Sequence, residues 1–163
     1  SKLLNSFGHP VPVIAGKLQH EGRDAAAKIL RADFTDAADT FAMDIASAYA
    51  VPELKKLTRT FTYTRTGQGS LTVADEFAFS KPESYAGALI TYGQWERHGG
   101  HGLLITDHGE SLNVTIDTAG VPFELESETI EEQTHNGQKP TRIGIHLKQP
   151  VTDGRVTLTI EPK

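Results

Sequence analysis

The segment Leu57–Phe79 carries the pattern that decides the fold. It begins Leu57-Thr58-Arg59-Thr60-Phe61-Thr62-Tyr63-Thr64-Arg65, turns at Gly67-Gln68-Gly69, and continues Leu71-Thr72-Val73-Ala74-Asp75-Glu76-Phe77-Ala78-Phe79. In the first arm threonines alternate with large or charged side chains, so the two sets face opposite sides of a strand. β-Branched and aromatic residues on both sides of a glycine-rich turn predict a β-hairpin.

Alternation of this kind, separated by turn residues, recurs along the chain. Turns at Asp107-His108-Gly109-Glu110, Asn136-Gly137 and Asp153-Gly154 are each predicted to close a hairpin. Strands are predicted over residues 11–15, 26–35, 39–47, 57–66, 70–79, 84–93, 102–107, 110–117, 121–132, 140–148 and 154–161. About ten to eleven short strands at this spacing predict an all-β, two-layer antiparallel β-sandwich. At most one or two short helices are expected, around Asp24–Ala27 and around Pro52–Leu57, where Pro52 suits a first helical position.

Length and composition narrow the class of protein. The 163 residues fit a single domain, 1–163, with no linker or internal repeat. The net charge is −5 and the 16 basic residues are scattered, which argues against nucleic acid or an anionic membrane as the partner. The sequence has no cysteine, so disulfides, thiolate metal sites and a cysteine nucleophile are excluded. No apolar run approaches the roughly 18 residues of a membrane-spanning helix.

Histidines give the first candidate sites, and each has a plain alternative. His9 stands just before the apolar strand 11–15, where it is either a metal ligand or active-site group, or a loop histidine that precedes Pro10. His98 and His101 lie in a glycine-rich loop and could face a cation together with His108 or Asp107. The alternative, which we favour, is that these are solvated loop histidines.

Aromatic and acidic residues give the remaining candidates. Tyr92 and Trp95 end a predicted strand beside that loop, and they either stack on a sugar ring or close the end of the sandwich. Asp75 and Glu76 point to opposite faces, so they cannot act as a catalytic pair, but one of them can form a cross-strand ion pair with Arg59. The acidic ladder is interpreted as the solvated face of an edge strand, and its members are Glu124, Glu126, Glu128, Glu131 and Glu132.

Four blocks of sequence together resemble the C-terminal β-sandwich region of the heparinase II/III-like family of bacterial polysaccharide lyases. The blocks are Gly8-His9-Pro10-Val11-Pro12-Val13-Ile14 with Gly16 and Gln19, then Asp44 with Ala48-Tyr49, then Leu57–Arg65, and then Leu71–Phe77. The likeness covers the first half of the chain well and the second half only as a generic sandwich. It implies a parent protein with an N-terminal α/α toroid, which cleaves acidic polysaccharides by β-elimination.

The resemblance also implies that the catalytic set is incomplete in this chain. The family's tyrosine base, its asparagine and its His-rich motif lie upstream of the block that matches Gly8-His9-Pro10, so no catalytic residue is assigned here. His9 matches the third ligand of a zinc ion held by some members. A single imidazole does not make a zinc site, so zinc is expected only in the full-length parent, and the isolated chain is expected to be inactive.

The resulting hypothesis is a sandwich domain that supports and partly lines the cleft of a lyase acting on an acidic polysaccharide. The expected partners are that polysaccharide and the toroid of the same parent, in the bacterial periplasm or outside the cell. The alternative is a stand-alone carbohydrate-binding or surface-interaction module without catalysis. The residues predicted to contact substrate are His9, Arg23, Arg59, Tyr92 and Trp95.

Overall fold

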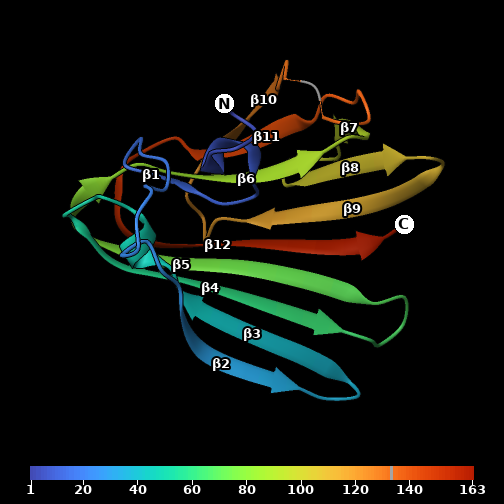
Figure 1. The fold of residues 1–163 in the computed structure, drawn as a ribbon. Helices are drawn as coiled ribbons and strands as arrows, with labels where there is room; N and C mark the ends of the chain where they lie inside the picture. The colour runs from blue at the N-terminus through green and yellow to red at the C-terminus, as the bar shows by residue number, and fades with distance from the viewer. Residues whose placement is uncertain (133) are drawn as a thin grey trace.

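The computed structural model describes residues 1–132 and 134–163, and in this part of the chain it forms two antiparallel sheets (Figure 1). These described residues contain twelve strands: β1 Val13–Ile14, β2 Lys28–Phe34, β3 Ala38–Asp44, β4 Leu54–Thr64, β5 Ser70–Glu83, β6 Tyr85–Thr91, β7 Gln94–Arg97, β8 Gly102–Asp107, β9 Glu110–Asp117, β10 Phe123–Thr129, β11 Thr141–Leu147 and β12 Val151–Pro162. The predicted all-β antiparallel sandwich is therefore confirmed. The short strand β7 is an addition to the predicted set.

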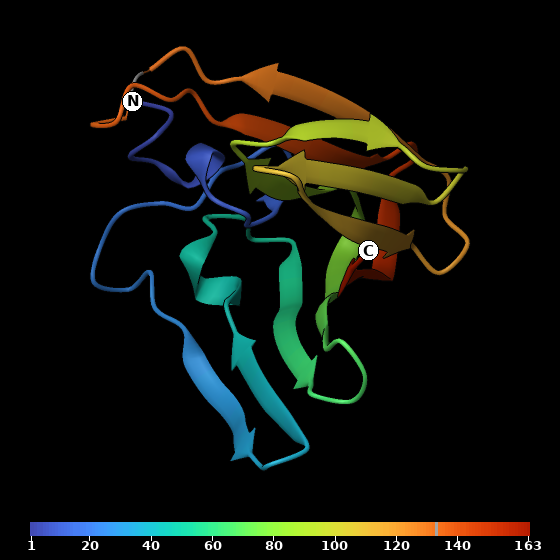
Figure 2. The same ribbon diagram turned by 90° about the vertical axis from the view of Figure 1, so that its right-hand side faces the viewer.

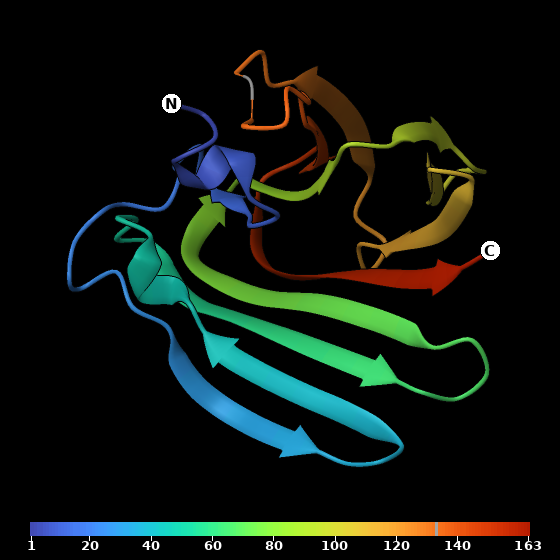
Figure 3. The same cartoon turned by 45° about the vertical axis from the view of Figure 1, so that its right-hand side comes forward.

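The two sheets differ in size and shape. The smaller has the order β1-β6-β11-β10, and the larger has the order β2-β3-β4-β5-β12-β9-β8-β7. The larger sheet curves, so that β9, β8 and β7 rise toward the smaller sheet while β2 and β3 extend away from it (Figures 2 and 3). The β2–β3 hairpin is consequently the least covered part of the fold.

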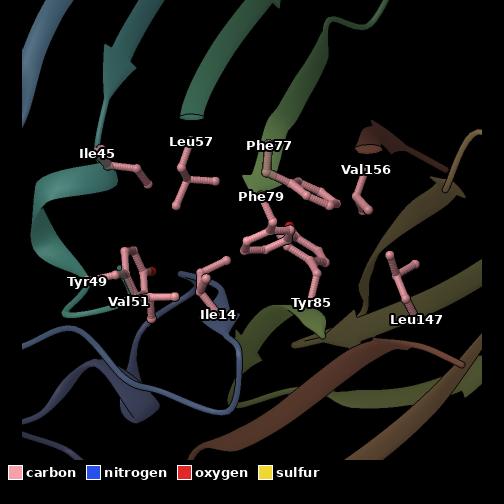
Figure 4. Close-up of a cluster of buried hydrophobic side chains, with 10 residues drawn as sticks. All are labelled: Ile14, Ile45, Tyr49, Val51, Leu57, Phe77, Phe79, Tyr85, Leu147 and Val156. Atoms are coloured by element: carbon pink, nitrogen blue, oxygen red, sulfur yellow. The ribbon is translucent and has the colours of Figure 1, made fainter. Parts of the chain in front are cut away.

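The β4–β5 hairpin forms as predicted and sets the two faces of the larger sheet. Its register pairs Phe61 with Val73 and Thr62 with Thr72. Leu57 and Phe77 point into the core, so the alternating threonines of β4 lie on the opposite, outer face. The main buried cluster of ten side chains fills the space between the sheets near the ends of β4 and β5 (Figure 4).

The helical predictions are wrong in position. Within the described part of the chain the helical elements are two single 3₁₀ turns, η1 Ser6–Gly8 and η2 Ala46–Ala48. Residues 24–27 form a turn followed by irregular chain, and Pro52 lies in a turn that leads directly into β4. Burial of Leu57 in the alternating pattern of β4 outweighs the weak local preference for helix. The predicted strand 39–47 stops at Asp44, whose carboxylate accepts the backbone N–H of Ala46 and opens η2.

The predicted hairpin turn at Asp153-Gly154 is also wrong. Both residues lie inside β12, beside an irregularity in its pairing with β5. Gly154 has a packing role instead, because an added Cβ would approach the Phe77 ring to 2.7 Å. In the described residues, no helix is long and apolar enough to cross a membrane.

Candidate functional site: the His9 segment

The segment Phe7–Pro12, which carries His9, is held through its backbone carbonyl groups. Three side chains from distant elements donate to five carbonyls of this segment. The bonds run from Arg142 Nη1 to Phe7 O (2.6 Å) and His9 O (3.1 Å), from Arg142 Nη2 to Val11 O (3.5 Å), from Arg59 Nη1 to Pro10 O (2.6 Å) and from Tyr49 Oη to Pro12 O (2.7 Å). We call these five carbonyls and three side chains the carbonyl clamp.

The local sequence suits this arrangement. Asn5 caps η1 by accepting the N–H of Phe7, and Gly8 is required because an added Cβ would lie 2.5 Å from the carbonyl oxygen of Lys2. Pro10 and Pro12 have no N–H to satisfy, so the carbonyls are the main polar groups of the segment. His9 itself is exposed. The result is an imidazole presented to solvent on a backbone whose carbonyls at Phe7, His9 and Pro10 are bound by arginine side chains.

Arg59 reaches the clamp from β4 and is almost fully buried. Its Nε and Nη2 atoms donate to the two carboxylate oxygens of Asp75, each at 2.7 Å, and Tyr85 donates to the same carboxylate at 2.6 Å. Burial opposes the charge of Arg59, but its hydrogen bonds with Asp75 and the charge of Asp75 outweigh this and raise the pKa of Arg59. Burial and the neighbouring Asp75 raise the pKa of Tyr85 well above its ordinary value. The guanidinium therefore stays charged and is held toward Pro10.

Arg142 reaches the clamp from β11, and it is held differently. Its residue is 5% exposed, and within the described residues no carboxylate lies in salt-bridge distance of its guanidinium. Its carbon Cζ lies 4.6 Å from the centre of the Phe7 ring. Burial lowers the pKa of Arg142, and the three carbonyls and the aromatic face provide the negative potential around the charge. This arginine thus stabilises the backbone conformation of the segment directly.

Two hollows flank the clamp. A groove of about 430 Å³ lies on the outer face of the smaller sheet, and its walls include Phe7, Glu126, Glu128 and His146. A mostly apolar hollow of about 370 Å³ lies between the sheets, next to Pro10, Val11 and Arg59. The groove carries both signs of charge, because Glu128 pairs with Lys2, Glu126 lies 3.5 Å from the His146 ring, and Arg142 also belongs to its walls.

The other predicted contact residues lie elsewhere. Arg23 is exposed on the loop between β1 and β2. Tyr92 is 48% exposed in the connection between β6 and β7. Trp95 on β7 is partly buried and packs against a second cluster of buried side chains, whose members are Leu103, Val114, Ile116, Ile143, Ile145 and Leu158. The structure therefore brings Arg59 to the His9 segment, but Arg23, Tyr92 and Trp95 are placed on separate surface elements. Their role in binding substrate remains a prediction.

His98, His101 and His108 do not form a metal-binding cluster in the described residues. His108 contacts Asp107 at the tip of the β8–β9 hairpin, and the His101 ring lies 5.9 Å from the centre of the Phe123 ring. Among residues 1–132 and 134–163, no group of three or more histidine, aspartate or glutamate side chains is placed to hold a metal ion. His9 is then a lone donor, so the described residues alone do not fit a zinc ion. Glu124, Glu126 and Glu128 lie exposed on β10, an edge strand, as predicted.

Two side chains of the carbonyl clamp, Arg142 and Tyr49, were not predicted from the sequence, although Tyr49 belongs to one of the blocks that carry the family resemblance. Arg142 alternates with the buried Ile143 and Ile145, so its position on β11 predicts only an outward-facing residue. The N-terminal segment that covers it is more than 130 residues away in sequence, and no local signal indicates this contact.

The fold of this chain is similar to that of known proteins. No protein-family model and no curated protein sequence matches the chain. Solved structures do match over nearly all of it. The chain has the fold of a heparinase III domain. The heparinase III BT4657 gene product superposes with a TM-score of 0.74 at 12% identity, and heparan sulfate lyase HepC from Pedobacter heparinus superposes with a TM-score of 0.75 at 11% identity. A further heparinase III structure gives a TM-score of 0.68 at 14% identity.

The coverage of these matches is unequal. They span 94–95% of this chain but only 23–24% of the matched proteins. The chain therefore corresponds in fold to about a quarter of a heparinase III-type lyase.

Proposed function

We propose that this chain is the β-sandwich domain of a heparinase III-type polysaccharide lyase, and that it supports and partly lines a cleft in which an acidic polysaccharide is cleaved by β-elimination. The observation that carries the proposal is the fold match over 95% of the chain, which accounts for only about a quarter of the matched lyases. On this proposal the chain by itself is inactive.

The carbonyl clamp supports a role at the rim of a cleft. An imidazole suits proton transfer or hydrogen bonding to a sugar only when its position is well defined. His9 meets this condition, because carbonyls on both sides of it are bound by Arg142 and Arg59. Its exposure leaves the ring free to meet a group supplied from outside this chain.

The positions of the charged side chains support the proposal that the isolated chain is inactive. β-Elimination of a uronide needs a group that neutralises the carboxylate, a base that removes the C5 proton and an acid that protonates the leaving oxygen. Near His9 the two arginines are buried and directed at backbone carbonyls, and Arg59 is also neutralised by Asp75. In the adjacent groove Glu126 and Glu128 lie beside Arg142 and His146, so the acidic and basic groups there balance each other. The cation and the remaining catalytic groups would therefore come from a second domain.

The proposal extends to that second domain and to the setting of the protein. The parent would carry an α/α toroid before this sandwich, a zinc ion would be bound only where the toroid adds ligands to His9, and the protein would act in the bacterial periplasm or outside the cell. The reading frame that encodes this chain provides a direct check, because it should also encode a helical domain of some hundreds of residues.

The decisive experiment compares the isolated chain with the product of the complete reading frame on heparan sulfate, heparin and alginate. Unsaturated uronide ends are followed by their ultraviolet absorbance. We expect activity only in the longer protein, a loss of at least about tenfold in its His9→Ala variant, and no change in the matched His108→Ala variant. Unsaturated ends produced by the isolated chain would overturn the proposal, as would a reading frame with no second domain.

A stand-alone carbohydrate-binding module is the second candidate, and the exposure of Tyr92 favours it. Trp95 is the only tryptophan and lies three residues from Tyr92, so its fluorescence reports on this surface alone. Titration of the isolated chain with alginate, heparin and neutral glycans separates the two candidates. A saturable shift that disappears in Tyr92→Ala supports the module, whereas a flat response supports the lyase domain.

A further inference from the structure

Strand β2 is an open edge of the larger sheet and is fully exposed. Its only strand neighbour in the described residues is β3, and all seven of its residues are exposed. Among the described residues, three of the seven large apolar side chains with high exposure belong to this one strand: Ile29 at 61%, Leu30 at 52% and Phe34 at 66%. A free edge of this kind presents backbone N–H and C=O groups to another strand. It lies at the far end of the sheet from β7, away from the smaller sheet (Figures 2 and 3).

The sequence of this edge is complementary to itself in the antiparallel direction. Around Ala32 it reads Lys28-Ile29-Leu30-Arg31-Ala32-Asp33-Phe34-Thr35-Asp36. When two copies are paired antiparallel with Ala32 opposite Ala32, Arg31 of each copy is opposite Asp33 of the other. Leu30 is then opposite Phe34. Opposite charges and apolar pairs at directly facing positions are the arrangement that stabilises a sheet.

We propose that two copies of this chain associate through β2, in an antiparallel pair centred on Ala32 that joins the two eight-stranded sheets into one. The two-fold axis runs perpendicular to the sheet, so each face of one sheet continues into the same face of the other. This inference depends on the edge alone and does not require the proposed lyase function.

The side-chain directions agree with this pairing. Arg31 pairs with Ala42 and Asp33 with Thr40 on β3, and both belong to the outer face of the sheet. In the single chain Arg31 Nη2 already donates to the Asp33 carboxylate at 3.0 Å, and both side chains are more than half exposed. Dimerisation exchanges the one pair inside each copy, two in total, for two equivalent pairs between the copies. Leu30 has no partner on β3, because the pairing is irregular between Ile29 and Arg31, and residues 31–34 of β2 pair regularly with β3. The regular part of the proposed pair is therefore centred on Ala32 and contains Arg31 and Asp33.

The other sheet edges do not offer the same complementarity. On β10, an antiparallel self-pairing centred on Glu126 places Glu124 opposite Glu128 in both halves, and like charges at facing positions are destabilising. Strands β1 and β7 have two and four residues, respectively, and offer few hydrogen bonds. Among the described edges, β2 is therefore the one with both length and matched charge.

A strand pair of this length is expected to give a weak, concentration-dependent dimer, because it buries less surface than a standard permanent interface. Sedimentation equilibrium of the 163-residue chain, up to millimolar concentration and at low salt, measures it. We expect a monomer–dimer equilibrium that shifts toward monomer as salt is added, since the facing charges are solvent-accessible.

Charge exchange tests the register. In Arg31→Asp the introduced carboxylate faces Asp33 of the second copy, and in Asp33→Arg two guanidinium groups face each other, so each variant alone should weaken the dimer at least about tenfold. The double variant R31D/D33R restores the complementarity and should dimerise like the parent chain. An equimolar mixture of the two single variants should form heterodimers. Lys148→Asp, the same charge change on an exposed residue away from β2, should leave the equilibrium unchanged.

Each outcome decides the proposal. Circular dichroism first confirms that every variant keeps its β structure. Recovery of the dimer in both the double variant and the mixture supports the Ala32-centred pair. A chain that remains monomeric at every concentration overturns it, and so does a dimer that is indifferent to R31D, because its interface would then lie elsewhere.

Discussion

Arg59 and Asp75 face each other across β4 and β5 and form a bidentate ion pair buried between the two sheets. Two parallel hydrogen bonds of 2.7 Å join the guanidinium to the carboxylate, and the side chains are 8% and 3% exposed. The predicted cross-strand ion pair is thereby confirmed. The carboxylate also accepts the Tyr85 hydroxyl, while the guanidinium binds Pro10. One pair thus links the core of the larger sheet to the segment that carries His9.

Removal of Asp75 should be costly. The Asp75→Ala variant leaves a buried guanidinium without its counter-ion, which costs about 3–5 kcal/mol of unfolding free energy. Glu76→Ala is the matched control, since Glu76 is the next residue on the opposite face and forms partly exposed pairs with Lys56 and Arg155. Those pairs are worth about 0–1 kcal/mol. Urea denaturation measures both variants, and equal losses would contradict the importance of the buried pair.

Arg142→Lys should loosen the His9 segment while the charge is kept. A lysine ammonium lacks the planar fork that reaches Phe7, His9 and Val11 together. Hydrogen exchange at the amides of residues 7–14 should accelerate about tenfold, which corresponds to the loss of about 1.4 kcal/mol of local stability. Arg155→Lys, on the exposed face of β12, should leave these amides unchanged. Unaltered exchange in Arg142→Lys would show that the segment is held without the clamp.

We expect His20 to make the loop that precedes β2 sensitive to pH. Its Nδ1 lies 3.0 Å from the carbonyl oxygen of Glu21 and its Nε2 lies 2.9 Å from that of Ser47. Only the doubly protonated ring donates to both, so these two carbonyls raise the pKa of His20 above 6.5. A raised pKa in the folded state means that this stabilisation is complete below the ordinary value and is lost as pH rises through the folded value.

An NMR titration of the His20 ring, combined with hydrogen-exchange rates of the backbone amides of residues 20–26, measures this effect. The midpoint of the His20 ring should lie above 6.5, and the loop amides should exchange faster once that midpoint is passed. The His20→Ala variant should lose this pH dependence while retaining the fold. A His20 midpoint at or below the ordinary value would refute the proposed contacts.

Gly154→Ala should destabilise the core of the sandwich. The added methyl group would lie 2.7 Å and 2.8 Å from two atoms of the Phe77 ring, which is stacked on Tyr85 at 4.2 Å between ring centres. Overpacking of this kind costs about 1–3 kcal/mol. Gly100→Ala is the control, because nothing lies within 4 Å of its added Cβ and its backbone is not in the left-handed region. Thermal unfolding of both variants gives the comparison, with Gly100→Ala expected to stay within about 0.5 kcal/mol of the parent.

Some elements were predictable to the residue and others were not. The alternation and turn residues of 102–117 predict β8 and β9 with the bounds that the structure has. β7 was missed because its four residues, Gln94–Arg97, contain too few alternating positions to stand out beside the glycine-rich loop. The turn predicted at Asp153-Gly154 failed because an Asp-Gly pair is also tolerated inside a strand where only glycine leaves room for Phe77.

The amino-acid pattern alone determined that this chain forms antiparallel strands with one apolar face, since side-chain direction in a strand depends only on neighbouring residues. It also predicted an ion pair of Arg59 with either Asp75 or Glu76, because a single hairpin brings them together, and the register of the structure selects Asp75. Only the tertiary structure decided that Arg142 and Tyr49 bind the carbonyls around His9. Those contacts join residues 37 and 133 positions apart in the chain. Their acceptors are backbone carbonyls, which every residue has, so no pattern of side chains predicts them.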